Sequence, residues 1–592
     1  MTDTMRDFRN IVTGREIPSE NYSDQPYVVK TDDGAWLCAM TTGTGHEGKA
    51  GQHVVAMRSS DHGRTWSEPI DVEPADGPVA AYAVLLKTPT GRIYCFYNHN
   101  TDEIPTGVRD MPRQPAYNLR RVDMLGHFVF KVSDDHGRTW SAERTEIPIR
   151  ETAIDRENVS GGTIRFFWTV GRPFAHRGVA YVPVHKIGGV GPEIINASEG
   201  VLLCSDNLLT GTDPAKIRWE TRPDGDAGLR PPPDGGPIAE EQSYSVLSDG
   251  TFYVVYRSVA GHPVYAYSRD HGRTWTEPRY ARYANGRLMK HPRAANFAWR
   301  CANGKFLYWF HNHGGRDFHD RNPAWLCSGR ETDSPTGRII EWSQPEILLY
   351  DDDPRIRLSY PDLIEEDGRF FITETQKDMA RVHELDPQLI EGLWGQFEDD
   401  RLAEHGLILN LPHPNEAMPP AVEAPPLPDF SATDRSQSDG RTRDLRAGFS
   451  IDLTIRLDSL APGQIVLDNR IENGCGCALR TTDQHTLEIL LNDGRTQSTW
   501  DCDPGMLNVA RKQHITIIVD GGPKIITFLV DGVLNDGGET RQFGWGRFSP
   551  HLRGVTGADR LRIGQQITAL RLYNRPLRTS EAIGNWRHTR PR

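Results

Sequence analysis

The chain has 592 residues, a formal net charge of −12 and 37% hydrophobic residues. This length can bury more than one hydrophobic core, and the acidic balance disfavours a nucleic-acid partner held by a basic surface. No run of 18 or more apolar residues occurs, so no membrane-spanning helix is expected. The first residues lack the apolar stretch of a secretory signal, which favours a cytoplasmic protein; secretion after loss of a leader is the alternative.

Cysteine is sparse, with eight residues in the whole chain. Cys38, Cys95, Cys204 and Cys327 lie in strand-like runs, where a thiol behaves as a small buried hydrophobic group. We therefore expect free thiols rather than disulfides. Metal-ligand spacing is missing, so we expect no cofactor and no catalytic metal, and a structural calcium is the one ion that would be compatible.

Three near-identical octapeptides, Ser59–Trp66, Ser133–Trp140 and Ser268–Trp275, end in Asp-His-Gly-Arg-Thr-Trp. Asp can accept hydrogen bonds from the amides of a tight turn, and Gly tolerates the positive φ of such a turn. Thr and Trp are then expected to enter a strand. The second interval between copies is about twice the first, so one unit recurs roughly every 70 residues. That period predicts degenerate copies, which are present at residues 205–219 and 336–342.

Short apolar runs that end in Gly or Asp-Gly turns separate the copies, as in Gly91–Tyr97 and Gly250–Tyr256. The octapeptide resembles the Asp-box, or BNR repeat, of the sialidase (neuraminidase) superfamily. This resemblance implies a β-propeller, and about 400 residues at about 70 per unit give six blades of four strands. Residues 1–411 are therefore expected to form a catalytic six-bladed β-propeller.

A domain boundary is expected after the propeller. Seven prolines between Leu411 and Phe430 disfavour helix and interior strand, so residues 412–429 are predicted to be a Pro-rich linker. Residues 430–592 contain alternating strands, and Ile567–Ile583 resembles the end of laminin-G/concanavalin A-like jelly rolls. The expected fold class is thus all-β, a six-bladed β-propeller followed by a β-sandwich (jelly roll). Whether the sandwich binds carbohydrate or only packs against the propeller is left open.

The resemblance to sialidases also assigns site residues. In that family a Glu precedes a strand-turn-strand that ends in a substrate-binding Arg, and Glu241 and Arg257 match this pattern. A Glu at the start of an inner strand points at the central channel, where burial can tune its pKa. Tyr360 lies in a segment that resembles the one bearing the nucleophilic Tyr. Arg321 matches a loop that delivers another Arg, with Arg316 as the competing choice.

Glu374 lies near the place of the family's Arg-orienting Glu, and two departures from the pattern follow. The family's first Arg is replaced by Asp24, and Arg15 could substitute only after a shift of register. The family's acidic Asp is absent, and the nearest carboxylate is Glu47, with His46 beside it as a proton-active group. The loss of one cation weakens the case for sialic acid as the substrate, but it does not weaken the case for a related glycosidase.

The resemblance implies an exo-glycoside hydrolase that removes a terminal, acidic, sialic-acid-like sugar from a glycan with retention. Tyr360 would attack the anomeric carbon while Glu241 takes its proton, and Glu47 would protonate the leaving oxygen. If Asp24 and Glu47 form an acid–base pair instead, the reaction would invert. The residues assigned to substrate binding are Arg257, Arg321, Asp24, Glu374 and His46.

Two other functions are open from the sequence. A polysaccharide lyase acting on a uronate-containing glycan would use Tyr360, His311 or His313 as a base beside Arg321. A non-catalytic carbohydrate-binding protein would use the propeller only as a scaffold. A glycan is the expected partner in each case, neither nucleic acid nor membrane is expected, and the sequence makes no prediction of the oligomeric state.

Overall fold

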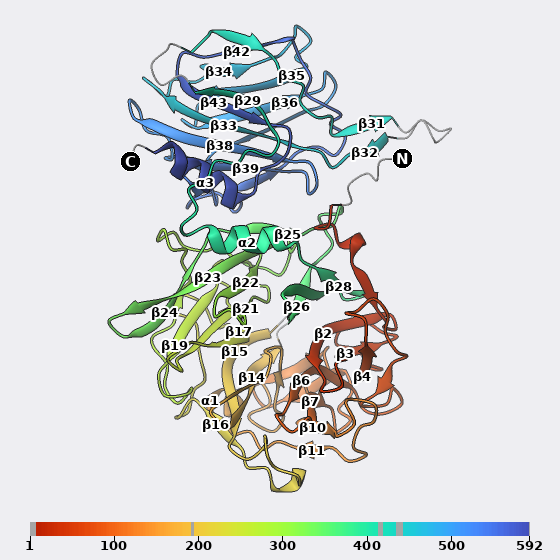
Figure 1. Cartoon of the computed structure of the whole chain (residues 1–592). Coiled ribbons are helices and arrows are strands. Elements are labelled where there is room, and N and C mark those ends of the chain that lie inside the picture. Colours follow the sequence, from red (N-terminus) through yellow and green to blue (C-terminus); the bar gives the residue numbers. More distant parts are fainter. Residues whose placement is uncertain (1–6, 191–194, 413–417, 434–441, 591–592) are drawn as a thin grey trace.

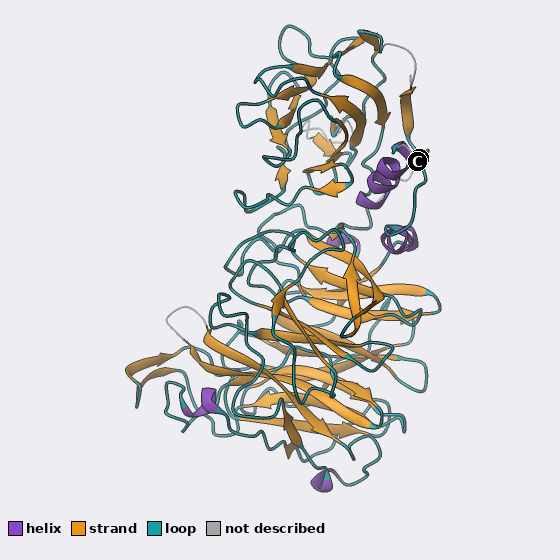
Figure 2. Ribbon diagram, turned by 90° about the vertical axis from the view of Figure 1, so that its left-hand side faces the viewer, coloured by secondary structure: helices purple, strands orange, loops and turns teal. Residues whose placement is uncertain are grey.

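The computed structural model describes residues 7–190, 195–412, 418–433 and 442–590. Six small antiparallel sheets form a ring, and two larger sheets stacked on each other follow it (Figure 1). The fold class is therefore the predicted one, an all-β six-bladed β-propeller followed by a β-sandwich. Figure 2 shows strands in nearly all of both domains and short helices where the two meet.

The blades follow one another along the chain, each with its first strand nearest the ring axis. Blades 1 to 3 contain β2 (Tyr22–Lys30), β3 (Trp36–Gly43), β4 (His53–Ser59) and β5 (Ile70–Asp71); β6 (Ala80–Lys87), β7 (Ile93–His99), β10 (His127–Ser133) and β11 (Thr145–Glu146); and β12 (Phe167–Trp168), β13 (Phe174–His176), β14 (Val179–Val190), β15 (Ile195–Ser205) and β16 (Glu220–Arg222). Blades 4 to 6 contain β17 (Glu240–Val246), β18 (Phe252–Arg257), β19 (Val264–Ser268) and β20 (Arg279–Tyr280); β21 (Phe297–Arg300), β22 (Phe306–Phe310), β23 (Ala324–Ser334), β24 (Gly337–Trp342) and β25 (Glu346–Leu349); and β26 (Ser359–Glu366), β27 (Arg369–Thr375), β28 (Ala380–Glu384) and β1 (Arg15–Ile17).

Short elements lie outside these sheets. They are the hairpin of β8 (Gly107–Met111) and β9 (Gln114–Leu119), the helices α1 (Ala153–Arg156) and α2 (Pro387–Gly395), and the 3-10 turns Ile11–Thr13 and Pro214–Lys216.

The three octapeptides form turns between the third and fourth strands of blades 1, 2 and 4. In the first copy Asp61 accepts hydrogen bonds from the Thr65 amide at 2.8 Å and the Thr65 hydroxyl at 2.7 Å, and Gly63 has a φ of 72°. Both hydrogen bonds recur in the other two copies. The expectation that Thr and Trp enter a strand is wrong, because Thr65 is committed to the turn carboxylate and β5 begins only after Trp66.

The same turns fasten one blade to the next. In each copy the His carbonyl accepts a hydrogen bond from an arginine of the preceding blade. The pairs are Arg15 to His62 at 3.4 Å, Arg222 to His271 at 2.7 Å, and Arg58 to His136. A sequence repeat has thus become a repeated contact between blades.

The two degenerate copies differ from the octapeptides and from each other. In blade 3 Asn207 replaces the turn Asp, and its side-chain oxygen accepts a hydrogen bond from the Arg218 amide at 2.9 Å. In blade 5 the copy is strand β24, which pairs with β23 as a hairpin. The turn carboxylate is therefore replaced by an Asn amide oxygen in blade 3 and by a regular hairpin in blade 5.

The ring is closed by the N-terminal strand. β1 pairs antiparallel with β28, with Arg15 opposite Val382 and Ile17 opposite Ala380. Blade 6 is thus built from both ends of the propeller sequence. All eight cysteines are free and seven of them are buried, as expected for small apolar side chains in strands.

The sandwich has two sheets and a C-terminal helix, α3 (Thr579–Thr589). The sheet facing the propeller contains β29 (Leu407–Pro412), β43 (Ile567–Tyr573), β33 (Phe449–Arg456), β38 (Lys512–Asp520), β39 (Ile525–Val530), β40 (Val533–Leu534) and β41 (Trp545–Arg547). The outer sheet contains β30 (Ala421–Glu423), β42 (Arg560–Ile563), β34 (Ile465–Asp468), β35 (Gly476–Thr481), β36 (Leu487–Asn492) and β37 (Gln497–Asp501), and β31 (Ser431–Thr433) pairs with β32 (Thr442–Asp444).

The segment expected to be a linker contributes to these sheets. β29 ends at Pro412 and β30 lies at residues 421–423, so the chain enters the sandwich before and within residues 412–429. Residues 413–417, which include Pro414, lie outside the described residues.

The two domains share a continuous apolar contact. Strand alternation points Ile518 and Leu529 of the sandwich away from its own core and toward Trp325 of the propeller, in one buried cluster. A polar contact adds to it, because the buried Glu346 of β25 accepts from the amides of Thr579 and Ser580 at the start of α3. The carboxylate caps amides that have no partner within the helix.

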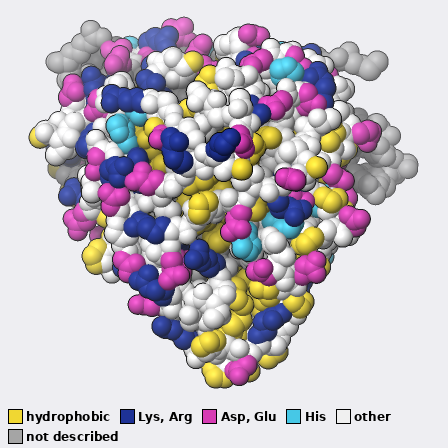
Figure 3. Space-filling view, turned by 90° about the horizontal axis from the view of Figure 1, so that it is seen from below, with side chains coloured by type: hydrophobic (Ala, Val, Ile, Leu, Met, Phe, Trp, Pro, Cys, Tyr) yellow, Lys and Arg dark blue, Asp and Glu magenta, His cyan; other side chains and the backbone are white. Residues whose placement is uncertain are grey.

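Two surface features complete the description. Among the described helices, none combines the length and the apolar composition that a bilayer span requires. At the end of the propeller farthest from the sandwich, basic and acidic side chains are interspersed over the surface (Figure 3).

Ring closure by β1 predicts a large difference between two apolar truncations near the N-terminus. Ile17 is 0% exposed, whereas Val12 is 66% exposed. Ile17→Ala should lower the free energy of unfolding by about 2–5 kcal/mol because it leaves a cavity between blades. Val12→Ala, the matched control, should change it by no more than about 0.5 kcal/mol. Urea unfolding followed by Trp fluorescence measures both, and equal effects would contradict the closure role of β1.

Candidate active site

Four inner strands share one irregularity near their start. β2, β6, β17 and β26 each show a shift of register against the second strand of the blade. A non-glycine residue with positive φ lies at each shift: Gln25 (56°), Tyr82 (63°), Glu241 (60°) and Tyr360 (47°). β-Bulges re-aim side chains, and a non-glycine residue with positive φ costs about 1–3 kcal/mol. Both features are concentrated at functional sites.

The bulges bring Tyr360 and Glu241 into direct contact across the axis. The Tyr360 hydroxyl donates to Glu241 Oε1 at 2.9 Å, and Arg257 Nη1 lies 3.0 Å from Glu241 Oε2. Arg257 also pairs with Glu240 at 2.5 Å, and Arg293 pairs with Glu240 at 2.7 Å. Three predicted residues from two blades, Glu241 and Arg257 of blade 4 and Tyr360 of blade 6, thus form one buried network.

Burial controls the protonation of this network. It raises the pKa of Glu241 above its usual range, Arg257 opposes that shift, and Glu240 adds to it. Burial and then Glu241 raise the pKa of Tyr360 far above its ordinary value. Burial acts the same way on Glu240, but Arg257 and Arg293 outweigh it and lower the pKa of Glu240 to about 2. Glu241 is therefore the carboxylate poised to exchange a proton.

Arg321, which the sequence assigned to substrate binding, lies beside Tyr360. Its Nη1 donates to Ser359 Oγ at 2.9 Å, and among the described residues no carboxylate lies within ion-pair distance of it. Its Nε has no hydrogen-bond partner, and burial lowers its pKa. The competing Arg316 is exposed on the same loop. Arg321 is thus a buried cation whose guanidinium keeps an unpartnered N–H donor at Nε.

A second cluster lies between this network and solvent. Lys377 Nζ lies 2.8 Å from Asp24 Oδ2, 3.4 Å from Glu47 Oε1 and 4.2 Å from the centroid of the Tyr360 ring. The exposed side-chain fraction falls from 30% at Glu47 to 16% at Lys377, 1% at Asp24 and 0% at Glu241. This gradient places the mouth of the site at Glu47 and its floor at the Tyr360–Glu241 pair.

Environment separates the two carboxyls of this cluster. Burial raises the pKa of Glu47, but Lys377 and Arg121 outweigh it and hold that pKa well below the usual range. Burial raises the pKa of Asp24, and the neighbouring Glu47 adds to the shift against Lys377. Asp24 Oδ2 also accepts from the Tyr22 hydroxyl at 2.7 Å, and its Oδ1 has no partner.

Sequence reasoning missed Lys377 and Arg121. Arg121 donates to Glu47 at 3.1 Å and to Asp123 at 2.7 Å, and its guanidinium lies over the Trp168 ring. Asp24 standing in the place of a cation was the signal that another positive side chain had to be supplied. Lys377, just past the end of β27, supplies it across the ring closure.

Three other residues do not join the site as expected. Glu374 pairs with His383 at 3.1 Å instead of orienting an arginine. Its neighbours Thr373 and Thr375 bond to β2, so the alternation of side chains along the strand places Glu374 on the opposite face. His46 is exposed on the Glu47 loop. Arg15 is in the outermost strand of blade 6, away from the axis.

A cavity of about 520 Å³ lies farther along the inner strands, past the bulges. Tyr27, Ser243, Phe297 and Asp362 are among its lining residues, and neither Tyr360 nor Glu241 lines it. A nearby cation, Arg172, is paired with Asp362 at 3.2 Å. The Tyr360–Glu241 pair therefore lies outside this cavity, one to two residues earlier along the inner strands.

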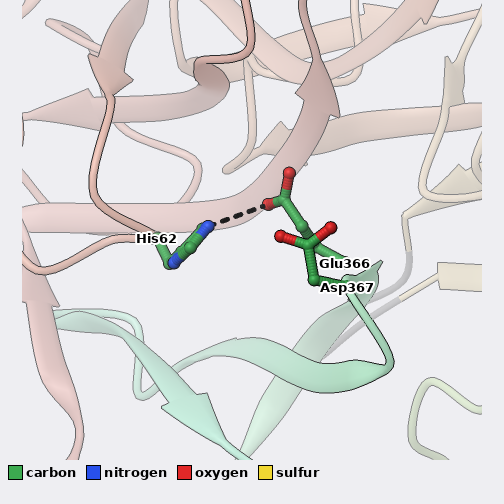
Figure 4. A group of neighbouring side chains, drawn as sticks. All are labelled: His62, Glu366 and Asp367. Carbon is green, nitrogen blue, oxygen red and sulfur yellow. Dashed lines mark ion pairs between the residues drawn. The ribbon is translucent and has the colours of Figure 1, made fainter.

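One group of side chains has the composition of a metal site. Ligand atoms of His62, Glu366 and Asp367 lie within 4.8 Å of one another (Figure 4). Glu366 is already committed, because it accepts from Trp36 Nε1 at 2.5 Å and pairs with Lys30 at 2.8 Å. These contacts explain the group as a tie between blade 1 and blade 6.

No protein-family model and no curated protein matches the sequence. Among solved structures, the Ruminococcus gnavus intramolecular trans-sialidase is similar at 14% identity, over 63% of this chain and 97% of that one, with a TM-score of 0.43. The Trypanosoma rangeli sialidase, solved with sialic acid, is similar at 14% identity, over 98% and 97%, with a TM-score of 0.41. The Hadza microbial sialidase Hz136 is similar at 17% identity, over 62% and 66%, with a TM-score of 0.42. At these values the similarities carry no information on substrate.

A buried histidine beside the site predicts acid sensitivity. Burial lowers the pKa of His185 to about 3, and its ring packs 5.0 Å from Trp168. The unfolded chain therefore takes up a proton that the folded one does not, and stability falls from about pH 6.5 toward pH 3 by up to about 1.4 kcal/mol per pH unit. His185→Gln should remove this contribution. Urea midpoints across that pH range, with His46→Gln as the exposed control, test it, and identical slopes would count against it.

Proposed function

We propose that this protein is an exo-glycoside hydrolase with Tyr360 as nucleophile and Glu241 as its base. The single observation that carries the proposal is the 2.9 Å hydrogen bond from the Tyr360 hydroxyl to Glu241, with Arg257 behind the carboxylate. A nucleophile within hydrogen-bond reach of a base that a third group orients is the arrangement that covalent catalysis needs. A Tyr nucleophile is known among glycosidases as an exception to the two-carboxylate rule.

In the first step the Tyr360 oxygen bonds to the anomeric carbon, the phenolic proton passes to Glu241, and the glycosidic bond breaks. The leaving oxygen takes a proton from an acid of the Asp24–Glu47 cluster. In the second step water bonds to the anomeric carbon and gives a proton to the conjugate base of that acid, the bond to Tyr360 breaks, and Glu241 returns its proton to the phenolate, so the configuration is retained. The raised pKa of Glu241 suits this role, because a base works best when its pKa lies near the operating pH.

The acid is best supplied by the Asp24–Glu47 pair. Glu47, the residue expected from the sequence, is held ionised by Lys377 and Arg121. Asp24 has the raised pKa. Where the surroundings of two carboxyls push their pKa values apart, the raised one is the proton carrier. We therefore assign the proton to Asp24 and the role of its charged partner to Glu47.

Arg321 supports an acidic terminal sugar. Its guanidinium is buried next to Tyr360 and has no carboxylate partner among the described residues, so a substrate carboxylate could complete its hydrogen bonds bidentately. The other cations near the axis are already paired, Arg257 with Glu240 and Glu241, and Lys377 with Asp24. The site can therefore hold one anionic group on the sugar without displacing an existing pair.

Elimination by a lyase is the second candidate, and the contacts of its proposed bases favour it less. His311 lies near the carbonyl of Pro323, with 3.3 Å from Nδ1 to the oxygen. His313 contacts the carbonyl of Asp320 at 2.8 Å and stacks on Phe543 of the sandwich. The His313 imidazole is therefore held in the contact between the domains, whereas the buried His311 keeps an unpartnered Nε2.

The proposal is tested with aryl glycosides of sialic acid, related 2-keto acids, uronic acids and pentofuranoses. Tyr360→Phe should reduce kcat on the best substrate by at least about 100-fold, because it removes the attacking oxygen. Tyr94→Phe is the control, since it removes another buried hydroxyl, one that donates to the Leu208 carbonyl. Wild-type rates in Tyr360→Phe would remove Tyr360 as the nucleophile. Glycan binding without turnover would favour a carbohydrate-binding protein, and ultraviolet absorbance of an unsaturated uronate would indicate a lyase.

The acid assignment predicts a dependence on the leaving group. Asp24→Asn should lose about 100-fold or more in rate with a poor leaving group and far less with one that departs without a proton. Glu47→Gln should lose less than Asp24→Asn on the poor leaving group. The matched control is Glu374→Gln, which alters a carboxylate paired with His383 away from this cluster. Equal losses of Asp24→Asn on both kinds of leaving group would contradict the assignment.

A further inference from the structure

The loop that carries Arg321 runs from β22 to β23 and lies against the sandwich. Three of its backbone groups bond to the sandwich near β41. Trp545 Nε1 donates to the Asn312 carbonyl at 2.8 Å, the Gly314 amide donates to the Gln542 carbonyl at 2.8 Å, and Arg547 donates to the Asn322 carbonyl at 2.6 Å.

Packing reinforces these hydrogen bonds. The His313 ring stacks on Phe543 at 4.8 Å between centroids, and the buried Trp545 lies 6.3 Å from Trp325. From the propeller, Lys290 reaches the carbonyls of Gly538 at 2.6 Å and Arg541 at 2.8 Å. The sandwich therefore contacts this loop by stacking and by hydrogen bonds along its length.

The sandwich loop that makes these contacts is itself fixed. Asp503 Oδ2 accepts from the amides of Asp536 and Gly537 at 2.9 Å each, and its Oδ1 pairs with Arg541 at 2.8 Å. A group can hold another in place only if its own position is set by packing and hydrogen bonds. This condition is met between β40 and β41.

Arg321, by contrast, has weak anchors of its own. Its side chain bonds to Ser359 Oγ at 2.9 Å and to the Arg293 carbonyl at 3.5 Å, both neutral acceptors. Without a carboxylate to hold the guanidinium, the backbone of the loop sets where it lies. Asn322, the next residue, is the one that Arg547 holds.

We propose that the sandwich is a working part of the site, in which Trp545 and Arg547 position the loop that presents Arg321 to the substrate. Arg547 and Trp545 are positioning residues, since they act through the backbone of Asn322 and Asn312. The sandwich thereby sets substrate affinity from outside the propeller. The kinetic side of this proposal rests on the proposed glycosidase function.

The kinetic test uses Arg547→Met in the full chain. The Arg547 side chain is exposed, so the substitution removes a donor without opening a core. We expect kcat/KM to fall about 10- to 100-fold, mainly through a rise in KM, as for a small displacement of a binding group. Arg547→Met should add little in an Arg321→Met background, because both changes act on one interaction. Arg480→Met on the outer sheet, where Arg480 pairs with Glu488, is the control and should keep wild-type kinetics.

A second measurement needs no activity. Hydrogen exchange in Trp545→Phe and Arg547→Met should rise in residues 311–323 and stay unchanged in the turn of residues 59–66. Unchanged exchange in that loop overturns the positioning role even if the enzyme proposal stands. Raised exchange with unchanged KM, or fully additive effects with Arg321→Met, overturns the link to Arg321. Full activity of Tyr360→Phe would sink the nucleophile assignment and leave the exchange result to decide the structural claim.

Discussion

Arg257 stabilises the two buried carboxylates of the site, Glu240 and Glu241. Glu240 and Glu241 are consecutive, and both carboxylates are buried where the blades meet. Two such charges without a cation would cost several kcal/mol each in desolvation and would repel each other. Arg257 lies directly across the ladder from Glu240, and its guanidinium contacts both carboxylates. Glu240 and Glu241 can stay buried because one planar, always-charged guanidinium contacts both carboxylates.

The ring turns a repeat along the chain into convergence in space. Each blade begins its inner strand at the axis, so one residue per blade can reach the same point. Bulges at Glu241 and Tyr360 aim the two side chains at each other although more than a hundred residues separate them in sequence. The strain of positive φ is sustained by regular pairing on both sides of each bulge.

What the sequence could predict follows from this arrangement. The octapeptide turn depends only on local contacts such as those of Asp61 and Thr65, so each copy in the sequence indicates a blade. Glu241 and Tyr360 were assigned from the resemblance to sialidases, and the structure has each of them at the start of an inner strand.

The residues that escaped prediction depend on register or on contacts across the ring. Lys377 meets Asp24 only because β1 closes the ring against β28. The role expected for Glu374 fails by a single residue of register. Thr373 and Thr375, on either side of it, face β2, and Glu374 faces the opposite side of the strand. The contact of Arg547 with Asn322 joins segments from different domains, and no local pattern encodes it.

The cations and the carboxyl groups of the site are equal in number, and this constrains how a ligand can be recognised. The cations are Arg121, Arg257, Arg293, Arg321 and Lys377, and the carboxylates are Asp24, Glu47, Asp123, Glu240 and Glu241. Four of the cations are already bound to protein carboxylates, so their positive charge is spent inside the protein. An acidic sugar, as proposed for the substrate, would thus be attracted by one buried guanidinium and not by a broad positive field. Under the proposed function, affinity depends on how accurately that guanidinium is placed, and this is why the contacts between the Arg321 loop and the sandwich matter to the proposal.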